Sequence, residues 1–323
     1  MSKEITKISH TFSAEEFVNP PWCLNGHAHT ILCSRLFTSP HLEFERKRID
    51  TPDGDFLDLD VTHNPAFNST VILLHGLEGS AHRYYIRRLA HRLHQDGFNV
   101  IAMNFRSCSG EMNLKPRFYH SGETEDFATV LKWAKTRQGT ERLFAAGFSL
   151  GASALLNYIH KYPENPLEAF AAISTPFDLH RGSLNLQKGF NKIYNLYFMR
   201  SLTKKLEEKR KHYPDLPAFS GSTLFDFDDK VTAPLHGFED AADYYKQCSS
   251  AFFMDRIQTN GLIIHSKEDP LCPFEYTPVD AINTNPNLTS LFPDRGGHVG
   301  FWSLPPGWTE NSVTGYFSQF MFD

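Results

Sequence analysis

The sequence predicts an α/β protein with a mostly parallel central sheet flanked by helices. Three observations predict this fold class. Strand and helix patterns alternate along most of the 323 residues, the expected strands are short and apolar throughout, and the chemically distinctive motifs directly follow strands. Strands that are buried on both faces have continuous apolar runs, and their alternation with helices is typical of a parallel sheet.

The expected elements can be placed in order along the chain. Residues 41–50 and 55–61 alternate around Pro52-Asp53-Gly54, which indicates a hairpin, and the segment before them, to about Pro40, is expected to be irregular surface structure. Further strands are expected at 69–76, 98–105, 142–148, 168–175, 260–266 and 287–293. Helices are expected at 80–96, 124–137 and 150–162, and again after each of the last two strands.

One stretch breaks this alternation, because residues 177–232 contain no strand signal. Within it, residues 184–213 have apolar side chains at three- and four-residue steps, and their second half is heavily charged. We expect one α/β domain over residues 1–323, with residues 177–232 inserted as a helical cap over the active edge of the sheet. An ordinary amphipathic surface helix, or a helix lying on a membrane surface, remains an alternative.

Composition and charge narrow the possible partners and location. The net charge is −5, whereas a nucleic-acid-binding protein usually has an excess of basic residues. The first residues have no apolar core, no run of about 20 apolar residues follows, and five cysteines are dispersed without a CxxC pair. We therefore expect reduced thiols, a cytoplasmic location, no membrane span and at most weak contact with a membrane surface. The oligomeric state is left open.

Ser149 is the expected nucleophile. It lies in Gly147-Phe148-Ser149-Leu150-Gly151, between an expected strand and an expected helix. A G-x-S-x-G pentapeptide in that context matches the nucleophile elbow, a sharp turn that projects the serine at the edge of the sheet. The five-residue pattern alone is weak, and a glycine-lined packing turn is the alternative.

An activated serine needs a base, and in this type of sheet the chain order is serine, acid, histidine. His298 is the only histidine after Asp269, and it lies in a glycine-flanked loop after the last expected strand. Asp269 directly follows an expected strand and is the preferred acid, with Asp178 as the alternative; Glu268 is expected to be a solvated loop charge. His265 is expected to pack within its strand.

The expected oxyanion hole consists of two backbone amides. One is the N–H of Leu150, next after the serine, and the other is the N–H of Leu77 in the loop His75-Gly76-Leu77. His75 is expected to shape that loop and to take no part in chemistry.

These motifs together resemble the α/β-hydrolase superfamily, and in particular its YheT-like branch, whose members are usually described as esterases. The resemblance covers about residues 17–320 and rests on NGHAHT at 25–30, NFRSCSG at 104–110, GFSLG at 147–151, EDP at 268–270 and GGHVGF at 296–301. It implies an α/β-hydrolase fold with Ser149 as nucleophile, Asp269 as acid and His298 as base.

The same resemblance carries expectations about the surroundings of the site. It implies that residues 25–30 pack near the active site with His27 hydrogen-bonded, and Ser107 stands where the family often has glycine. Some relatives carry a membrane anchor and act on lipid esters, whereas this chain resembles the soluble bacterial members. Relatives in fungi make and cleave medium-chain ethyl esters.

Metal and cofactor motifs are not recognisable. His27 and His29 lack a carboxylate or cysteine that would complete a metal-ligand set. Phe225–Lys230 lacks the glycine and glutamate of a calcium loop and is expected to be a solvated turn. The sequence contains no motif of a phosphate-binding loop. We expect no cofactor and no metal.

The sequence thus predicts a serine carboxylic-ester hydrolase that acts through an acyl-enzyme on a small-molecule ester. The many Phe, Tyr and Leu residues of 177–232 favour an apolar acyl group of short to medium length. Two alternatives remain: an acyltransferase that uses the same three residues with an alcohol acceptor, and a non-catalytic binding protein on a hydrolase scaffold.

Overall fold

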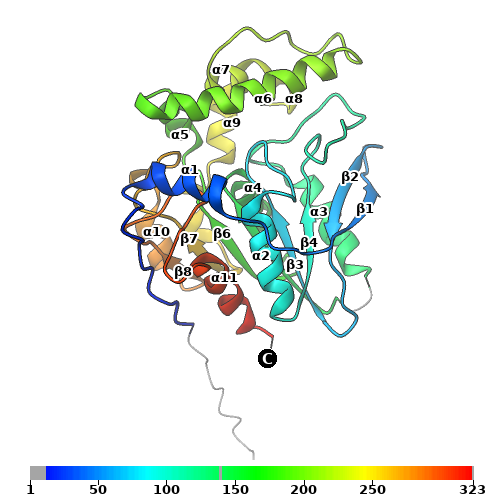
Figure 1. Cartoon of the computed structure of the whole chain (residues 1–323). Coiled ribbons are helices and arrows are strands. Elements are labelled where there is room, and N and C mark those ends of the chain that lie inside the picture. Colours follow the sequence, from blue (N-terminus) through cyan, green and yellow to red (C-terminus); the bar gives the residue numbers. More distant parts are fainter. Residues whose placement is uncertain (1–11, 138–139, 322–323) are drawn as a thin grey trace, which may run out of the picture.

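The computed structural model describes residues 12–137 and 140–321, which form a central eight-stranded sheet with helices on both faces (Figure 1). The strand order is β1-β2-β4-β3-β5-β6-β7-β8; β1 pairs antiparallel with β2 and β2 with β4, and all other pairs are parallel. The strands are β1 (Glu45–Asp50), β2 (Phe56–Val61), β3 (Ser69–Leu74), β4 (Phe98–Met103), β5 (Arg142–Phe148), β6 (Leu167–Ile173), β7 (Asn260–Ile264) and β8 (Leu288–Leu291). The predicted sheet, hairpin included, is confirmed.

Two sets of helices cover the sheet because successive residues of a buried strand point to opposite faces. Val71 and Leu73 of β3 belong to the apolar core under α2 and α11, whereas Ile72 and Leu74 belong to the core under α3 and α4. These helices are α2 (Tyr84–Gln95), α3 (Glu125–Lys135), α4 (Leu150–Lys161) and α11 (Trp308–Ser318). The continuous apolar strands are therefore buried on both faces, as the sequence pattern predicted.

The segment before Pro40 contains a helix, α1 (Gly26–Leu36), so the expectation of irregular structure there was wrong. Asn25 caps this helix, since its side chain accepts a hydrogen bond from the Ala28 N–H at 2.9 Å. The residues that α1 buries are Gly26, His29 and Cys33, which form no apolar stripe that a sequence pattern could reveal. Loops from the far end of the chain stabilise α1 instead.

Residues 179–235, here called the helical insertion, lie between β6 and β7 in the sequence. They contain α5 (Leu179–Asn185), α6 (Lys192–Arg210), α7 (Leu224–Phe227) and α8 (Ala233–Leu235). Figure 1 shows α6 crossing the top of the molecule, above α9 (Ala241–Cys248), with the remaining short helix α10 (Val279–Thr284) beside β8. The division of the chain into one domain with a cap at 177–232 stays a prediction.

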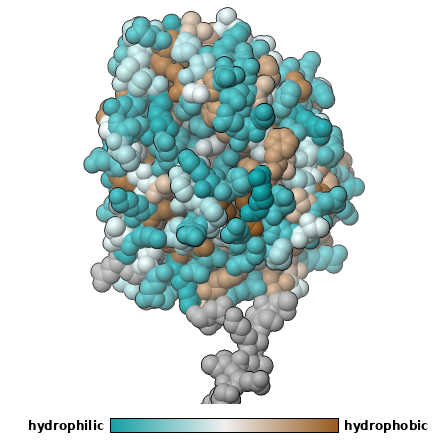
Figure 2. All heavy atoms as spheres, turned by 180° about the vertical axis from the view of Figure 1, so that it is seen from behind, coloured by the Kyte–Doolittle hydropathy of each residue, from teal (hydrophilic) through white to brown (hydrophobic). Residues whose placement is uncertain are grey.

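In the described part of the chain, no helix combines the length and the apolar character needed to cross a bilayer. Seen from behind, the surface is mostly hydrophilic, with apolar residues in scattered spots (Figure 2). Single exposed apolar residues are normal for a folded protein.

A buried charge cluster joins the β1–β2 hairpin to the loop after β4. The guanidinium of Arg106, whose side chain is 2% exposed, binds both carboxylate oxygens of Asp126 at 2.7 and 2.8 Å. It also binds Asp53 at 2.9 Å and Asp55 at 3.0 Å. The next residue, Ser107, has φ +61°, which is a left-handed conformation that glycine adopts without strain. This agrees with the glycine that the YheT-like branch often has at this position.

Replacing Arg106 with Met should strongly destabilise the fold, because the buried carboxylates of Asp55 and Asp126 would lose the cation that compensates their burial. Breaking a buried pair from one side costs about 3–5 kcal/mol, and we expect a loss of unfolding free energy of that size in urea. The matched control is Arg92→Ala, which removes an exposed pair with Asp96 and should cost about 0.5 kcal/mol or less. Equal losses in the two variants would contradict this account.

Candidate active site

Ser149 lies in the turn between β5 and α4 with φ +54° and ψ −121°, a backbone conformation that non-glycine residues rarely adopt. The turn is held by the Ser149 N–H, which donates to the carbonyl of Ile173 at 2.9 Å. Gly151 permits the close approach of α4 to the sheet, because a Cβ there would lie 2.5 Å from the carbonyl oxygens of both Leu74 and His75. The serine is thereby held above the carboxyl ends of the strands.

The structure brings the three predicted site residues together in one hydrogen-bonded chain. Ser149 Oγ lies 2.8 Å from His298 Nε2, and His298 Nδ1 lies 2.9 Å and 3.1 Å from the two carboxylate oxygens of Asp269. The Asp269 carboxylate also accepts the backbone N–H groups of Leu271 and Cys272, both at 2.9 Å. An imidazole so placed donates from Nδ1 and can accept a proton at Nε2.

Two opposing effects set the pKa of Asp269. Burial alone would raise the pKa of this carboxyl, but the facing imidazole of His298 and the donated hydrogen bonds outweigh burial, and the pKa lies below its ordinary value. Asp269 therefore carries a negative charge beside the imidazole ring across the neutral pH range. That charge favours a proton on His298 Nδ1.

The other two acids that the sequence offered lie in different surroundings. Asp178 caps α5, accepting the Arg181 N–H at 2.9 Å, and Glu268 pairs with Arg295 at 2.6 Å. Of the three acids considered, Asp269 is the one hydrogen-bonded to His298. His265 is buried just after β7, where its Nε2–H donates to the carbonyl of Cys272 at 2.7 Å.

Helix α1 supports both the acid loop and the histidine loop. Gly26 packs so tightly against the acid loop that a Cβ there would lie 1.8 Å from the carbonyl oxygen of Glu268. Thr30 Oγ1 donates to the Gly26 carbonyl at 2.7 Å and accepts the His298 N–H at 2.9 Å. The NGH-x-x-T motif thus joins two loops that come from the last quarter of the chain.

The two histidines of α1 are hydrogen-bonded within the protein. His29 Nδ1 accepts the Trp302 N–H at 3.2 Å, its Nε2–H donates to Asn19 Oδ1 at 2.7 Å, and burial lowers its pKa to about 4. His27 Nδ1 lies 3.1 Å from the hydroxyl of Tyr194 on α6, as the family resemblance implied for a hydrogen-bonded His27. His27 and His29 thus have different partners and do not converge on a common site.

The two predicted oxyanion donors are free to bind a ligand. In residues 12–137 and 140–321, no protein acceptor pairs with the backbone N–H of Leu77 or Leu150, and both residues line the same pocket as Ser149 and His298. The loop that carries Leu77 is shaped by His75, whose Nδ1–H donates to Gly76 O at 2.7 Å while Nε2 accepts the Phe105 N–H at 3.1 Å. Burial lowers the pKa of His75 to about 3, so the ring is neutral.

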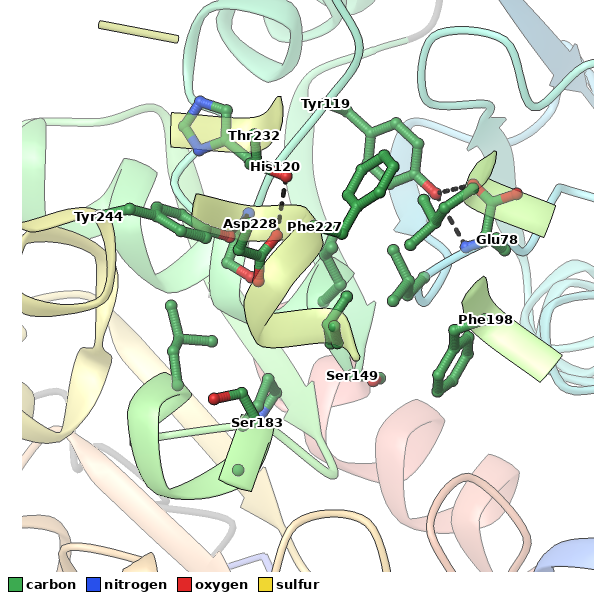
Figure 3. A pocket seen from close by; sticks show the side chains of 18 of the residues that line it. Glu78, Tyr119, His120, Ser149, Ser183, Phe198, Phe227, Asp228, Thr232 and Tyr244 are labelled. Atoms are coloured by element: carbon green, nitrogen blue, oxygen red, sulfur yellow. Dashed lines mark hydrogen bonds between the residues drawn. The ribbon is translucent and has the colours of Figure 1, made fainter. Parts of the chain in front are cut away.

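Glu78, next to Leu77, is a functional candidate that the sequence reasoning missed. It has φ +55°, and its N–H donates to the hydroxyl of Tyr119 at 2.8 Å, while that hydroxyl donates to the Glu78 carboxylate at 2.9 Å (Figure 3). Two α6 side chains, Ser201 and Lys205, also bind the carboxylate, the lysine Nζ at 2.9 Å. Only the folded chain brings these groups together, so no local motif marks them.

A mostly apolar pocket opens above Ser149 between the sheet and the helical insertion. The empty space there is about 1030 Å³, a figure that includes the part open to solvent. In Figure 3, Ser149 lies at the base, Glu78 and Tyr119 lie on one side, and Asp228 and His120 lie on the other. Its apolar lining includes Leu150, Leu186, Phe198, Leu202, Leu224 and Phe227.

The turn that contains Asp228 was expected to be solvated, and this was wrong. Asp228 begins a π-helical turn (Asp228–Thr232) that directs its carboxylate inward, where it accepts the hydroxyl of Thr232 at 2.7 Å and of Tyr245 at 2.8 Å. Burial raises its pKa to about 6. The sequence "FDFDDK" contains several acids, and periodicity does not show which one turns inward.

His120, Glu123 and His236 offer atoms within 4.8 Å of one another, but their hydrogen bonds do not suit a metal ion. His120 Nδ1 accepts the Gly122 N–H at 3.1 Å, which leaves the ring proton on Nε2, whereas a ligating histidine donates from its second nitrogen. Glu123 already binds Arg117 at 2.7 Å. The ring of His120 packs against that of His236 with a centroid distance of 4.4 Å, so the arrangement is an internal side-chain cluster.

Comparisons with known proteins agree with this architecture. A family model described as the alpha/beta hydrolase fold matches residues 69–305. The chain is 34% identical to "Putative esterase YheT" of Escherichia coli K12 over 99% of this chain and 98% of that protein, and 27% identical to the human "Phospholipase ABHD3" over 89% and 74%.

A solved structure shows the same fold. The esterase Pf2001 of Pyrococcus furiosus superimposes with a TM-score of 0.59 at 19% identity, covering 86% of this chain and 92% of that one. The relatives' names point to hydrolysis of the esterase or lipase type. Sheet order, matched residues and near full-length similarity agree that this chain belongs to the α/β-hydrolase fold family.

Proposed function

We propose that the protein is a serine carboxylic-ester hydrolase that works through an acyl-enzyme. The observation that carries the proposal is the hydrogen-bonded chain from Ser149 through His298 to Asp269, at the base of an apolar pocket. The esterase and phospholipase names of the relatives support the same class of reaction.

The geometry supports a two-step acyl transfer. In the first step His298 Nε2 takes the hydroxyl proton of Ser149 as Oγ attacks the ester carbonyl, and the Leu77 and Leu150 amides would bind the oxyanion. The tetrahedral intermediate collapses as His298 returns the proton to the departing alcohol, leaving an ester on Ser149. Water then attacks with His298 as base, the acid is released and the serine hydroxyl is restored. Asp269 stabilises the imidazolium in both steps.

Replacing Ser149 with Ala should abolish labelling by a fluorophosphonate probe and lower kcat for p-nitrophenyl butyrate by about four to six orders of magnitude. Ser183→Ala is the matched control, because Ser183 lines the same pocket but its hydroxyl donates to the His180 carbonyl. The control should still be labelled. A wild-type protein that the probe does not label would favour a non-catalytic binding protein.

The acyl specificity is proposed from the pocket lining. A series of p-nitrophenyl esters should give the highest kcat/KM at short to medium acyl chains, because Leu202, Leu224 and Phe227 line the pocket with apolar side chains. Leu202→Trp, which narrows the pocket, should shift that optimum towards acetate. A flat profile or a long-chain optimum would contradict the assignment.

Product analysis with added ethanol tests the acyltransferase alternative, which requires ester to form faster than acid.

Lys205 is proposed as a positioning residue for the oxyanion loop, since it binds the buried carboxylate of Glu78, the neighbour of Leu77. Lys205→Met should lower kcat about tenfold with little change in KM for a short ester, because a displaced amide weakens binding of the transition state more than of the substrate. Lys205→Arg should restore most of kcat.

The control for Lys205 is Lys211→Met, the same chemical change at the exposed end of the same helix. It should leave kcat unchanged. If Lys205→Met lowers thermal stability but not kcat, the lysine serves only to hold α6, and the positioning role is wrong.

A further inference from the structure

The outer face of α6 is unusually apolar for a helix on the surface. Its inner face packs against the rest of the protein, since Met199 and Leu206 are buried and Leu202 lines the pocket. On the outer side, however, Ile193 is 55% exposed and Leu196 is 68% exposed. A surface helix of a globular protein normally has polar side chains on its solvent face, so the first half of α6 departs from that pattern.

Two more large side chains extend this apolar face. Phe190, in the 3₁₀ turn that leads into α6, is 48% exposed, and Tyr197 is 53% exposed. Phe190 contacts the ring of His27 at a centroid distance of 4.7 Å, and the Tyr197 hydroxyl accepts a hydrogen bond from Arg83. The two aromatic side chains are therefore held in place while much of their surface remains in water.

The same segment carries charge of a single sign. Residues 188–205 contain five basic residues and no Asp or Glu, although the whole chain has a net charge of −5. Lys205 is paired with Glu78, whereas the other four are exposed and, within the part of the chain that the structure describes, form no ion pair. Those four are Lys188, Lys192, Arg200 and Lys204.

We propose that this outer face of residues 188–204 docks on an anionic lipid surface, with α6 lying parallel to the membrane plane. Apolar residues at Phe190, Ile193 and Leu196 would enter the headgroup region, and Lys192 and Arg200 would contact lipid phosphates and carboxylates. Binding of a helix to the membrane interface grows with the apolar area that it buries there and with its attraction to anionic lipid, and this face offers both exposed apolar and exposed basic side chains. The four exposed, unpaired cations of this segment give it a local positive charge that is complementary to anionic lipid, although the whole chain is acidic.

The position of α6 would bring a docked membrane close to the pocket above Ser149. The helix crosses the top of the molecule (Figure 1), and side chains on its opposite side line the pocket above Ser149. A bilayer held against the outer face would lie one helix diameter, about 10 Å, from the pocket. The proposal concerns binding alone and does not depend on the proposed catalytic function.

The test is cosedimentation of the full chain with vesicles of phosphatidylcholine alone and of equal parts phosphatidylcholine and phosphatidylserine. We expect binding to the mixed vesicles, reduced by high salt, and at least about tenfold weaker binding to the neutral ones. Ile193→Ser combined with Leu196→Ser should reduce binding to the mixed vesicles about tenfold or more, and Lys192→Glu combined with Arg200→Glu should remove the preference for phosphatidylserine.

The matched control is Phe252→Ser, which removes another exposed aromatic residue, 61% exposed, outside the helical insertion. It should bind like the wild type, and unchanged melting temperatures would show that all variants are folded. Failure of the wild type to bind mixed vesicles, or equal binding by all variants, would overturn the proposal. A dimer in light scattering that Leu196→Ser dissociates would also overturn it, because the occupant would then be a second copy of the chain.

Discussion

The close contact between the start of α4 and the end of β3 is the constraint on which the site depends. The backbone of Gly151 lies against the carbonyl oxygens of Leu74 and His75, and no larger residue fits there. This contact fixes the strained turn at Ser149 and places the free amide of Leu150 beside the loop that carries Leu77. The stability of the two buried cores is what sustains such strain at the edge of the sheet.

A second set of contacts ties the site to parts of the chain that are remote in sequence. Helix α1 holds the loops of Asp269 and His298 through Gly26 and Thr30, and it touches α6 through His27. Helix α6 in turn binds Glu78 beside the proposed oxyanion donor. The pocket is therefore enclosed by segments that also position the reacting groups, so a shift of α6 would change both the space above Ser149 and the loop beneath it.

The sheet could be predicted because its strands are buried on both faces and separated by clear turn signals. The proximity of Ser149, Asp269 and His298 could also be expected, since each follows a strand and the carboxyl ends of parallel strands share one edge. Contacts between distant segments could not be predicted: α1 has no apolar stripe, and Glu78 and Asp228 are ordinary acids until the fold buries them. The exposure of Ile193 and Leu196 was hidden too, because their spacing is equally that of a core-facing helix.

The support of His298 by α1 also has a consequence for synthesis of the protein. Thr30 and His298 are 268 residues apart, and Ser149 precedes His298 by 149 residues. On the ribosome, β3, β5 and the turn at Ser149 emerge well before His298, the residue that would take the serine's proton. Helix α1 also emerges before the loops of Asp269 and His298, against which it packs in the folded protein. A nascent chain is thus without a complete hydrogen-bonded chain at Ser149 until His298 has emerged, which would keep the serine unreactive while the earlier part of the protein is folding.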